Sequence, residues 1–520
     1  MKNIIMSLIL YGPFISLTSI AQSIDVSLPL NRAVYQRNTN NQATIPVRLQ
    51  VNESSATEIR IKFEKINYKT GLTPIPSIIE EHTLAQDGLF DKDYTLTTGW
   101  YVLTITTYDH KQNVVSNHTS KVGVGEVFIS AGQSNSQGTP LSAEGGPPLL
   151  SGLSYDAIQA INQNCFCKKE YPFPIIERME RSAVDGQKKI APNGNQNIWF
   201  YEVLGREIAD KTEGTPVLFF NAASTGSSIE NWSTSANSSS AITNTPWTVN
   251  CSKDVLEWNS DGPEGFPYRA LSTSLRYYGG MFGVRSILWH QGETDNYINT
   301  TAANYKLQLE NVITRSRQHF NANLGWAISR ASHFPGFANN SNIVSAQTTV
   351  KSAIKNTTWG AYYSDNYIGA NMYRQSDNLH LNPEGLKKIG QMFANGTTDN
   401  LEKPNGFVTP WTLQPIEAAR VPTISVENGT DLVIDGQYTS YCWVRDNGNI
   451  NNCDYFSTSS NILPNPKPGK WRCYVTQISP TSDSNQFQRV TTLTGNVTMP
   501  LTMRIGQSLS IDSFHINYEP

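Results

Sequence analysis

The stretch from Val127 to Gly138 reads VFISAGQSNSQG. Its first four residues fit a strand buried on both faces, and the chain then turns abruptly to small and polar residues. Ser134 lies in this turn, directly after the strand. Sites in parallel α/β sheets form at the carboxyl ends of the strands. Ser134 is therefore either a turn residue that merely ends a strand or a nucleophile placed at a site.

The region from about 122 to 400 repeats the pattern of short apolar strands followed by longer amphipathic stretches. The predicted strands are 127–130, 216–222, 286–290, 325–329 and 360–364, and the predicted helices include 199–212, 269–279, 302–320 and 382–395. Apolar strands that alternate with helices indicate a parallel sheet covered on both faces. We therefore predict an α/β domain over 122–400.

Both flanks of this region have the alternating apolar and polar pattern of β-strands. Residues 23–121 predict an antiparallel β-sandwich, and the Pro-rich segment 401–418 predicts a linker. Residues 419–520 predict a second β-domain. It loosely resembles an immunoglobulin-like sandwich, with Trp443 in the core and Trp471 and Cys473 on a later strand. A chain of 520 residues is long enough for such a multidomain arrangement.

Composition and the N-terminus limit the class of protein. The formal net charge is -3 and 16% of residues are charged, with no basic block, so nucleic-acid binding has no support. In 1–22, Lys2 precedes an apolar run that is interrupted by Gly12-Pro13 and ends in small residues near Ala21. This pattern predicts a cleaved signal peptide, and hence a secreted, periplasmic or cell-surface protein. No other apolar run is long enough to span a membrane.

Six cysteines fit an oxidising compartment. Cys442 and Cys453 are equidistant from Asn447-Gly448, a hairpin signal, so they are expected to face each other across the ladder, with Cys473 as the competing partner. In the central region, either Cys165 or Cys167 is expected to meet Cys251. Metal binding is the weaker interpretation of these cysteines, because no CxxC pair or His-rich spacing is present.

Three further polar segments accompany the turn at Ser134. ILWHQGETD (287–295) places polar residues directly after an apolar strand, and a Gln amide there can donate to developing negative charge. NAASTGSSIENW (221–232) follows another strand and holds Gly226, where a backbone N–H can approach a ligand. SDNLHLNPEG (376–385) spaces Asp377 and His380 so that the carboxylate can orient the imidazole, just ahead of a helix capped by Asn382.

Together these segments resemble the SGNH hydrolases, also called GDSL-type esterases. GQSN, WHQGE and Asp-x-x-His resemble in particular the sialate O-acetylesterase-like branch, carbohydrate esterase family 6. The resemblance implies a flavodoxin-like three-layer α/β/α fold and removal of acetyl groups from sugars without metal or cofactor. It implies Ser134 as nucleophile, His380 as general base and Asp377 as its orienting carboxylate. It also implies an oxyanion hole made by the N–H groups of Ser134 and Gly226 and the side chain of Gln291.

The remaining motif residues are expected to support this site. They are Gly132, Gln133, Asn135, His290 and Glu293, with Gly132 permitting the sharp turn and Glu293 accepting a hydrogen bond. The sequence departs from the family pattern at Ser136, where an apolar side chain is usual, and at Thr225-Gly226-Ser227, where Gly-Gly-Thr is usual. Trp232, Trp247 and Tyr268 are candidates for stacking on sugar faces, although aromatic residues mostly fill cores.

The leading hypothesis is a secreted carbohydrate O-acetylesterase that acts on an acetylated glycan, with β-domains that contact glycans or a cell surface. One alternative is an acetylxylan or other small-acyl SGNH esterase. Another is a catalytically inactive glycan-binding surface protein. The sequence does not distinguish sialic acid from xylan or other acetylated sugars, and the intact Ser134, Asp377 and His380 argue against lost catalysis.

Overall fold

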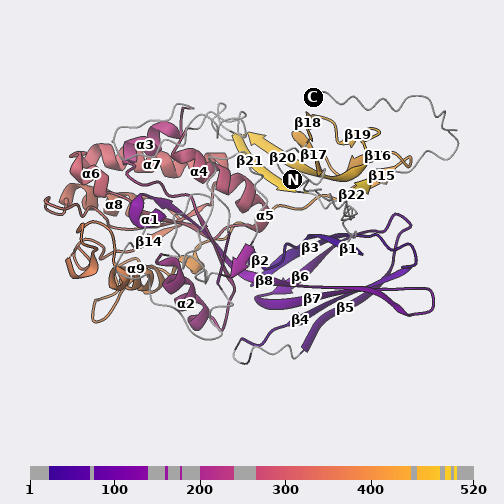
Figure 1. Cartoon of the computed structure of the whole chain (residues 1–520). Helices are drawn as coiled ribbons and strands as arrows, with labels where there is room; N and C mark the ends of the chain where they lie inside the picture. Colours follow the sequence, from indigo (N-terminus) through magenta and orange to yellow (C-terminus); the bar gives the residue numbers. More distant parts are fainter. Residues whose placement is uncertain are drawn as a thin grey trace, which may run out of the picture.

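The computed structural model describes residues 23–68, 70, 75–138, 158–161, 176–178, 199–238, 265–369, 371–446, 454–480, 487–493 and 497–499. Figure 1 shows an α/β part on one side and two β-rich parts, from the two ends of the chain, on the other. The predicted signal peptide (1–22), Trp247, and Cys165, Cys167, Cys251 and Cys453 lie outside the described residues.

The N-terminal part forms two layers of strands. One sheet has the order β1-β3-β6, and β5, β4 and β7 lead antiparallel to β8 in the other. The strands are β1 (Ile24–Leu28), β2 (Ala33–Gln36), β3 (Gln42–Val51), β4 (Glu58–Lys65), β5 (Ile75–Thr83), β6 (Leu89–Thr97) and β7 (Gly99–Tyr108). Alternate residues of β4 are buried, and Phe63 contacts Tyr94 of the other sheet, with ring centroids 5.2 Å apart. The two sheets therefore enclose one apolar core.

Strand β8 (Val114–Gly132) joins the N-terminal part to the α/β part without interruption. It runs for 19 residues. Its first half pairs antiparallel with β7, its middle pairs parallel with β2, and its last residues pair parallel with β11 and β12. The domain boundary that we placed between 121 and 122 therefore falls inside a single strand.

The α/β part is built on a parallel sheet in the order β9-β11-β8-β12-β13-β14, with β10 antiparallel at the edge. The strands besides β8 are β9 (Ile158–Ile161), β10 (Ile176–Arg178), β11 (Val217–Asn221), β12 (Ser286–His290), β13 (Gly325–Ile328) and β14 (Thr357–Trp359). The mixed α/β class is confirmed, as are the strands predicted at 216–222, 286–290 and 325–329. The strand predicted at 360–364 is wrong, because the β-branched Thr357 and Thr358 pair with β13 and the chain turns after Gly360.

Helices cover both faces of this sheet. On one face, α2 (Tyr201–Lys211) and α9 (Pro383–Asn395) pack with Phe128, Phe219 and Leu288. On the other face, α3 (Ile229–Ser235), α4 (Tyr268–Thr273), α7 (Ala302–His319) and α8 (Ser341–Ala353) pack with alternate residues of the same strands. The helix predicted at 269–279 continues from α4 as a π-helix (Ser274–Gly279) and ends in α5 (Gly280–Phe282). Short 3-10 turns lie at Asn371–Tyr373 and Pro410–Thr412.

None of the helices in these ranges is both long and apolar enough to cross a bilayer.

The C-terminal part contains two antiparallel sheets, β15-β16-β19 and β18-β17-β20-β21, with β22 paired to β20. Its strands are β15 (Ile424–Glu427), β16 (Asp431–Ile434), β17 (Ser440–Asp446), β18 (Asp454–Thr458), β19 (Ile462–Leu463), β20 (Gly469–Pro480), β21 (Phe487–Leu493) and β22 (Val497–Met499). Trp443 lies in its core and Trp471 and Cys473 lie on the later strand β20, as predicted, and all three belong to one apolar cluster.

The predicted cross-strand alignment of Cys442 with Cys453 is wrong. Ser457 lies opposite Cys442, because the ladder of β17 and β18 closes at Arg445 and Asp454 and leaves a longer connection than a two-residue turn. On its other side Cys442 opposes Tyr474, while Cys473 opposes Trp443 and points to the other face of the sheet. No disulfide joins cysteines within the described residues.

A buried ion cluster lies where β8 passes between the two sheets. Glu126 is fully buried, and its carboxylate is 2.6 Å from Arg37 Nε and 2.7 Å from Arg285 Nε. Arg285 is itself buried and donates to the carbonyl of Leu413 in the predicted linker. The Glu126 carboxylate on β8 thus connects to the N-terminal part through Arg37, and through Arg285 to the segment that leads to the C-terminal part.

We expect Arg285→Ala to lower the free energy of unfolding by about 3 kcal/mol. The substitution removes one of the two arginines that pair with the buried Glu126 carboxylate and leaves Arg37 as its remaining partner. Lys306→Ala removes one partner of an exposed ion pair with Glu310 and is expected to change stability by about 0.5 kcal/mol or less. Denaturant unfolding followed by circular dichroism measures both. Equal effects of the two variants would show that the buried cluster contributes no more than a surface pair.

Candidate active site

The turn that carries Ser134 depends on a close contact between β8 and β12. Gly132, the last residue of β8, has φ 133°, and a Cβ there would lie 2.0 Å from the carbonyl oxygen of His290. Only glycine fits this combination of backbone angle and contact. The chain then enters the short helix α1 (Ser134–Gln137), and Ser134 is only 2% exposed. The expected role of Gly132 in the turn agrees with this geometry.

The structure brings Ser134, His380 and Asp377 together from segments far apart in the chain. Ser134 Oγ lies 3.0 Å from His380 Nε2, and His380 Nδ1 lies 2.5 Å from Asp377 Oδ2. Asp377 also accepts the backbone N–H groups of Leu379 and His380. Asn382 caps α9 by accepting from Gly385 N, so the loop ends on a rigid helix start.

The electrostatics of Asp377 favour a permanent carboxylate. Burial raises its pKa, but the hydrogen bonds from the His380 side chain and from the N–H groups of His380 and Leu379 outweigh burial and bring the pKa to about 2. The carboxylate can therefore hold the Nδ1–H tautomer of His380, which leaves Nε2 as an acceptor facing Ser134.

Asn135 holds the loop of His380 against the turn of Ser134. Its side-chain amide donates to the carbonyl of Leu379, and its oxygen accepts from Leu381 N, 3.1 Å away. These two contacts flank His380 on both sides. The same amide nitrogen lies 3.1 Å from Glu293 Oε1. A single side chain thus fixes the distance between two segments separated by more than two hundred residues.

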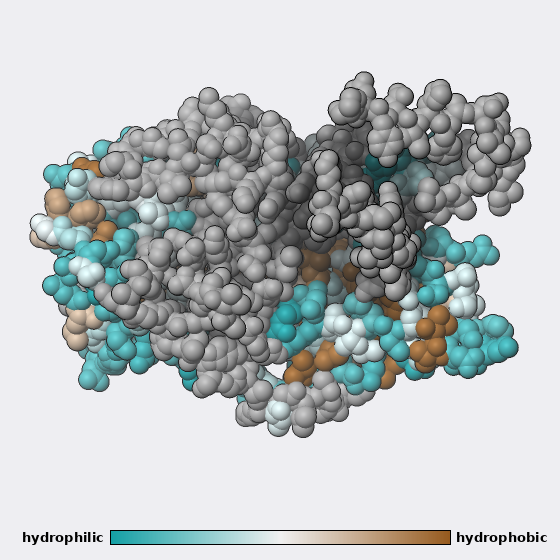
Figure 2. All heavy atoms as spheres, in the orientation of Figure 1, coloured by the Kyte–Doolittle hydropathy of each residue, from teal (hydrophilic) through white to brown (hydrophobic). Residues whose placement is uncertain are grey.

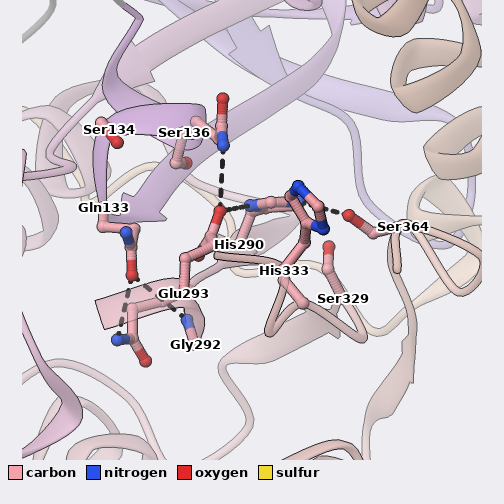
Figure 3. Close-up of polar contacts among 12 residues, drawn as sticks. Gln133, Ser134, Ser136, His290, Gly292, Glu293, Ser329, His333 and Ser364 are labelled. Carbon is pink, nitrogen blue, oxygen red and sulfur yellow. Dashed lines mark hydrogen bonds and ion pairs between the residues drawn. The ribbon is translucent and has the colours of Figure 1, made fainter. Parts of the chain in front are cut away.

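Gln133 connects the turn to the segment after β12. Its backbone N–H donates to His290 O, and its side-chain oxygen accepts from Gly292 N at 3.3 Å and Thr294 N at 3.2 Å. Figure 3 shows the Gln133 side chain directed toward Gly292. Gln133 therefore caps the helix α6 (Glu293–Tyr297), and hydrogen bonds join the motif GQSN to the motif WHQGE.

Gln291 is fully buried, and the protein already uses its amide protons. Its Nε2 lies 2.5 Å from Asp295 Oδ2 and 3.1 Å from Ser227 O, and its oxygen accepts from Tyr305. An amide nitrogen has only two protons to donate. Donation by Gln291 to an oxyanion therefore requires exchange of one of these bonds, and in the structure the residue positions the loop at Ser227.

The loop of Gly226 is held on both sides. Gly226 has φ 70°, and the N–H of the preceding Thr225 donates to Gln137 Oε1 at 2.7 Å. Beyond it, Ser228 caps α3, and Ile229 N donates to Asp295 Oδ2 at 2.9 Å. Burial raises the pKa of Asp295 to about 6, while its hydrogen bonds act in the opposite direction. The loop is thus attached both to the helix of Ser134 and to the buried neighbours of Gln291.

His290 and Glu293 form a buried support behind the turn. His290 Nε2 lies 2.9 Å from Ser364 Oγ, and Nδ1 lies 3.5 Å from Glu293 Oε1 (Figure 3). Burial lowers the pKa of His290 and favours the neutral ring. Arg374, also buried, donates to Leu379 O at 2.8 Å and places its charge near Glu293. The supporting roles expected for His290 and Glu293 are consistent with these contacts.

The structure disagrees with two of the predicted sugar-stacking residues. Trp232 is fully buried, donates to Ser227 Oγ and contacts the ring of Trp289, while Tyr268 is fully buried against His319. Both fill the core, where most aromatic residues lie.

Ser136, where the family pattern has an apolar side chain, is also fully buried. Its hydroxyl donates to Ala131 O and so stabilises the turn after β8.

The sequence interpretation overlooked several residues around the loop of His380. Arg374 and Asp365 are buried and hydrogen-bond to this loop or its neighbours, and His333 Nε2 lies 2.9 Å from Asn378 O. Their signal in the sequence is weak, since each is a single polar residue in an irregular segment. Within the described ranges, no group of three His, Cys, Asp or Glu residues is placed to hold a metal ion.

A search of curated proteins finds no match. Among solved structures, the salicylyl-acyltransferase SsfX3 from a tetracycline biosynthetic pathway is similar at 9% identity, over 67% of this chain and 80% of its own, with a TM-score of 0.25. Fibronectin(III)-like modules of Clostridium thermocellum CbhA are similar at 10% identity, over 19% of this chain and 94% of theirs, with a TM-score of 0.14. At these TM-scores the likenesses support no conclusion about function.

The family comparison is more informative. The model of a family described as carbohydrate esterase, sialic acid-specific acetylesterase, matches residues 124–399. The match starts in β8 and ends after α9, so it contains every residue of the site described above. Since it spans more than half of the 520 residues, the chain belongs to the family of sialic acid-specific acetylesterases among the carbohydrate esterases.

Proposed function

We propose that this protein is an exported carbohydrate O-acetylesterase that removes acetyl esters from sugars by a Ser-His-Asp mechanism. The observation that carries the proposal is the chain of contacts from Ser134 Oγ to His380 Nε2 at 3.0 Å and from His380 Nδ1 to Asp377 at 2.5 Å. These are the distances that a nucleophile, its base and an orienting carboxylate require. Membership of a carbohydrate esterase family supports the same reaction class.

The proposed reaction has two acyl-transfer steps. Ser134 Oγ attacks the acetyl carbonyl while its proton passes to His380 Nε2, and the imidazolium is stabilised by Asp377. His380 then returns the proton to the sugar oxygen as the C–O bond breaks, which leaves acetyl-Ser134. Water, deprotonated by His380, attacks this ester, and acetate departs as Ser134 regains its proton. Atoms and charges balance without a metal or a redox group.

The developing oxyanion needs hydrogen-bond donors near Ser134. The N–H of Ser134 lies in the first turn of α1, where helix N–H groups have no acceptor within the helix. The N–H of Gly226, in the loop tied to Gln137, is the second proposed donor. Gln291 is proposed to act by holding Ser227 and, if one of its internal bonds exchanges, as a third donor. One such donor is typically worth about 3 kcal/mol in the transition state.

We further propose an SGNH-type, flavodoxin-like three-layer classification for the central part. The order β11-β8-β12-β13-β14, with helices on both faces, supports it. The proposed domains are 23–121, 122–400 and 419–520 around the linker 401–418, with immunoglobulin-like sandwiches at both ends and β8 shared across the first boundary. Export follows from the proposed signal peptide at 1–22.

Ser134→Ala is expected to lower kcat for a chromogenic acetyl ester by about 10⁴-fold or more, because it removes the nucleophile. Ser136→Ala is the matched control, because it makes the same substitution in the same buried turn at a hydroxyl that donates to Ala131 O. This control is expected to retain activity within about tenfold. Turnover that survives in the Ser134 variant would exclude the serine mechanism, and an inactive wild-type protein would support a glycan-binding role instead.

Activity is expected to fall along a single acidic limb, since an imidazolium cannot accept the serine proton. The pKa of Asp377, lowered to about 2, keeps its carboxylate ionised down to mildly acidic pH. Its ionisation contributes stability that is present above the pKa of an unfolded aspartic acid and is lost only as the pH falls toward 2. The pH profile of kcat/KM measures the limb, and a rate that stays flat well below pH 6 would contradict His380 as the base.

A further inference from the structure

Aromatic side chains gather on a turn at the same end of the sheet as the candidate active site. Phe334-Pro335-Gly336-Phe337 follows β13, and Phe337 N donates to Phe334 O at 3.1 Å. Proline at the second position and Gly336 with φ 78° at the third are the signature of a type II turn. This turn presents Phe334 and Phe337 at its two ends, and their ring centroids lie 5.6 Å apart.

Tyr297 completes the cluster from a different segment. It is the last residue of α6, and its ring centroid lies 4.8 Å from that of Phe334 and 5.6 Å from that of Phe337. Despite these contacts, Phe337 is 47% exposed and Tyr297 is 41% exposed. Figure 2 shows hydrophobic atoms among hydrophilic ones at the end of the molecule where Figure 1 places α6. Rings that touch yet remain open to solvent form a preformed apolar face.

Buried polar contacts hold this aromatic turn in place. The amide of Asn296 donates to the carbonyls of Ser332 at 2.7 Å and Ala338 at 3.0 Å, on either side of the turn. The carboxylate of Asp365 accepts from Ser332 N at 2.7 Å, and the backbone carbonyl of Asp365 accepts from the Asn339 side-chain amide. A short surface turn with this much support loses little conformational entropy when a ligand binds to it.

The same turn is joined to the loop of the proposed base. His333, next to Phe334, lies with Nε2 2.9 Å from the carbonyl oxygen of Asn378, and Asn378 follows Asp377 directly. On the other side, α6 begins at Glu293, whose carboxylate contacts the Asn135 amide beside Ser134. The aromatic cluster is therefore connected to Asp377 through His333 and Asn378, and to Ser134 through α6 and Asn135.

We propose that Tyr297, Phe334 and Phe337 form a sugar-binding platform that stacks on a pyranose ring of the glycan whose acetyl group is attacked by Ser134. The inference rests on the proposed function. An acetyl group is small, so most of the substrate affinity must come from the sugar, and pyranose rings offer apolar C–H faces to aromatic rings. Small acetyl esters have no pyranose ring, so the platform is expected to favour glycan esters over them.

The test compares substrates of different length on the full chain. Phe337→Ala, Phe337→Trp and wild type are assayed with p-nitrophenyl acetate, O-acetylated sialyllactose and O-acetylated xylotetraose. The quantity compared is the ratio of kcat/KM for the glycan that the wild type hydrolyses to kcat/KM for p-nitrophenyl acetate. Phe337→Ala is expected to lower this ratio about tenfold, mainly by raising KM for the glycan. Phe337→Trp is expected to restore the ratio. Leu307→Ala, which truncates a 67% exposed residue of α7, is the matched control and leaves the ratio unchanged.

The outcomes separate this inference from the proposed function. Absence of turnover of every substrate by the wild type would overturn the esterase assignment itself. Turnover of p-nitrophenyl acetate with neither glycan hydrolysed, or a ratio within twofold of wild type in Phe337→Ala, would overturn the platform and leave the esterase standing. A larger effect on acetylated sialyllactose or on acetylated xylotetraose identifies which of the two sugars the platform binds.

Discussion

The contact between the ends of β8 and β12 governs the geometry of the site. At Gly132 the two backbones approach so closely that no side chain fits, and the positive φ turns the chain toward Ser134. The neighbouring Gln133 then bonds back to β12 through His290 O and forward to Gly292 N. The position of Ser134, the proposed nucleophile, is therefore set by an adjacent strand as well as by its own turn. Functional groups held by regular elements in this way keep more precise geometry than groups carried by loops alone.

The proposed base has no such strand beneath it, and buried polar side chains supply the missing rigidity. His380 lies in an irregular segment between Asp377 and the start of α9. Asn135 bonds the backbone on both sides of His380, and Arg374 donates to the same Leu379 carbonyl from a buried position. Because Asn135 follows Ser134 directly, the proposed nucleophile and the proposed base are held in place by the same side chain. Such networks are strong when every member is satisfied and costly when one is lost, so these residues matter although they do not contact the reacting atoms.

The sequence predicted the parts of this molecule that depend on local pattern. Apolar runs located β11, β12 and β13, and the order of Ser134, Gly226, Gln291, Asp377 and His380 located the candidate site, because these residues follow strand ends or precede a capped helix. The prediction failed where tertiary contacts decide. The aromatic run at 360–364 is a turn, and Cys442 opposes Ser457. The turn Phe334–Phe337 did carry a readable signal in Pro335-Gly336, which becomes meaningful only once Tyr297 is placed beside it.

Strand β8 also changes how the N-terminal part relates to the site. A β-domain attached through a flexible linker transmits no rigidity, whereas this one shares a 19-residue strand with the central sheet. Its residues from Val114 pair with β7, and those up to Gly132 pair with β12. Between these two segments, Glu126 binds Arg37 from the N-terminal part and Arg285, which directly precedes β12. Displacement of the β-domain would therefore either break a buried charge cluster or move the strand that ends at Ser134, and both are costly in a packed interior. The N-terminal strands are in this sense part of the scaffold that positions the proposed nucleophile.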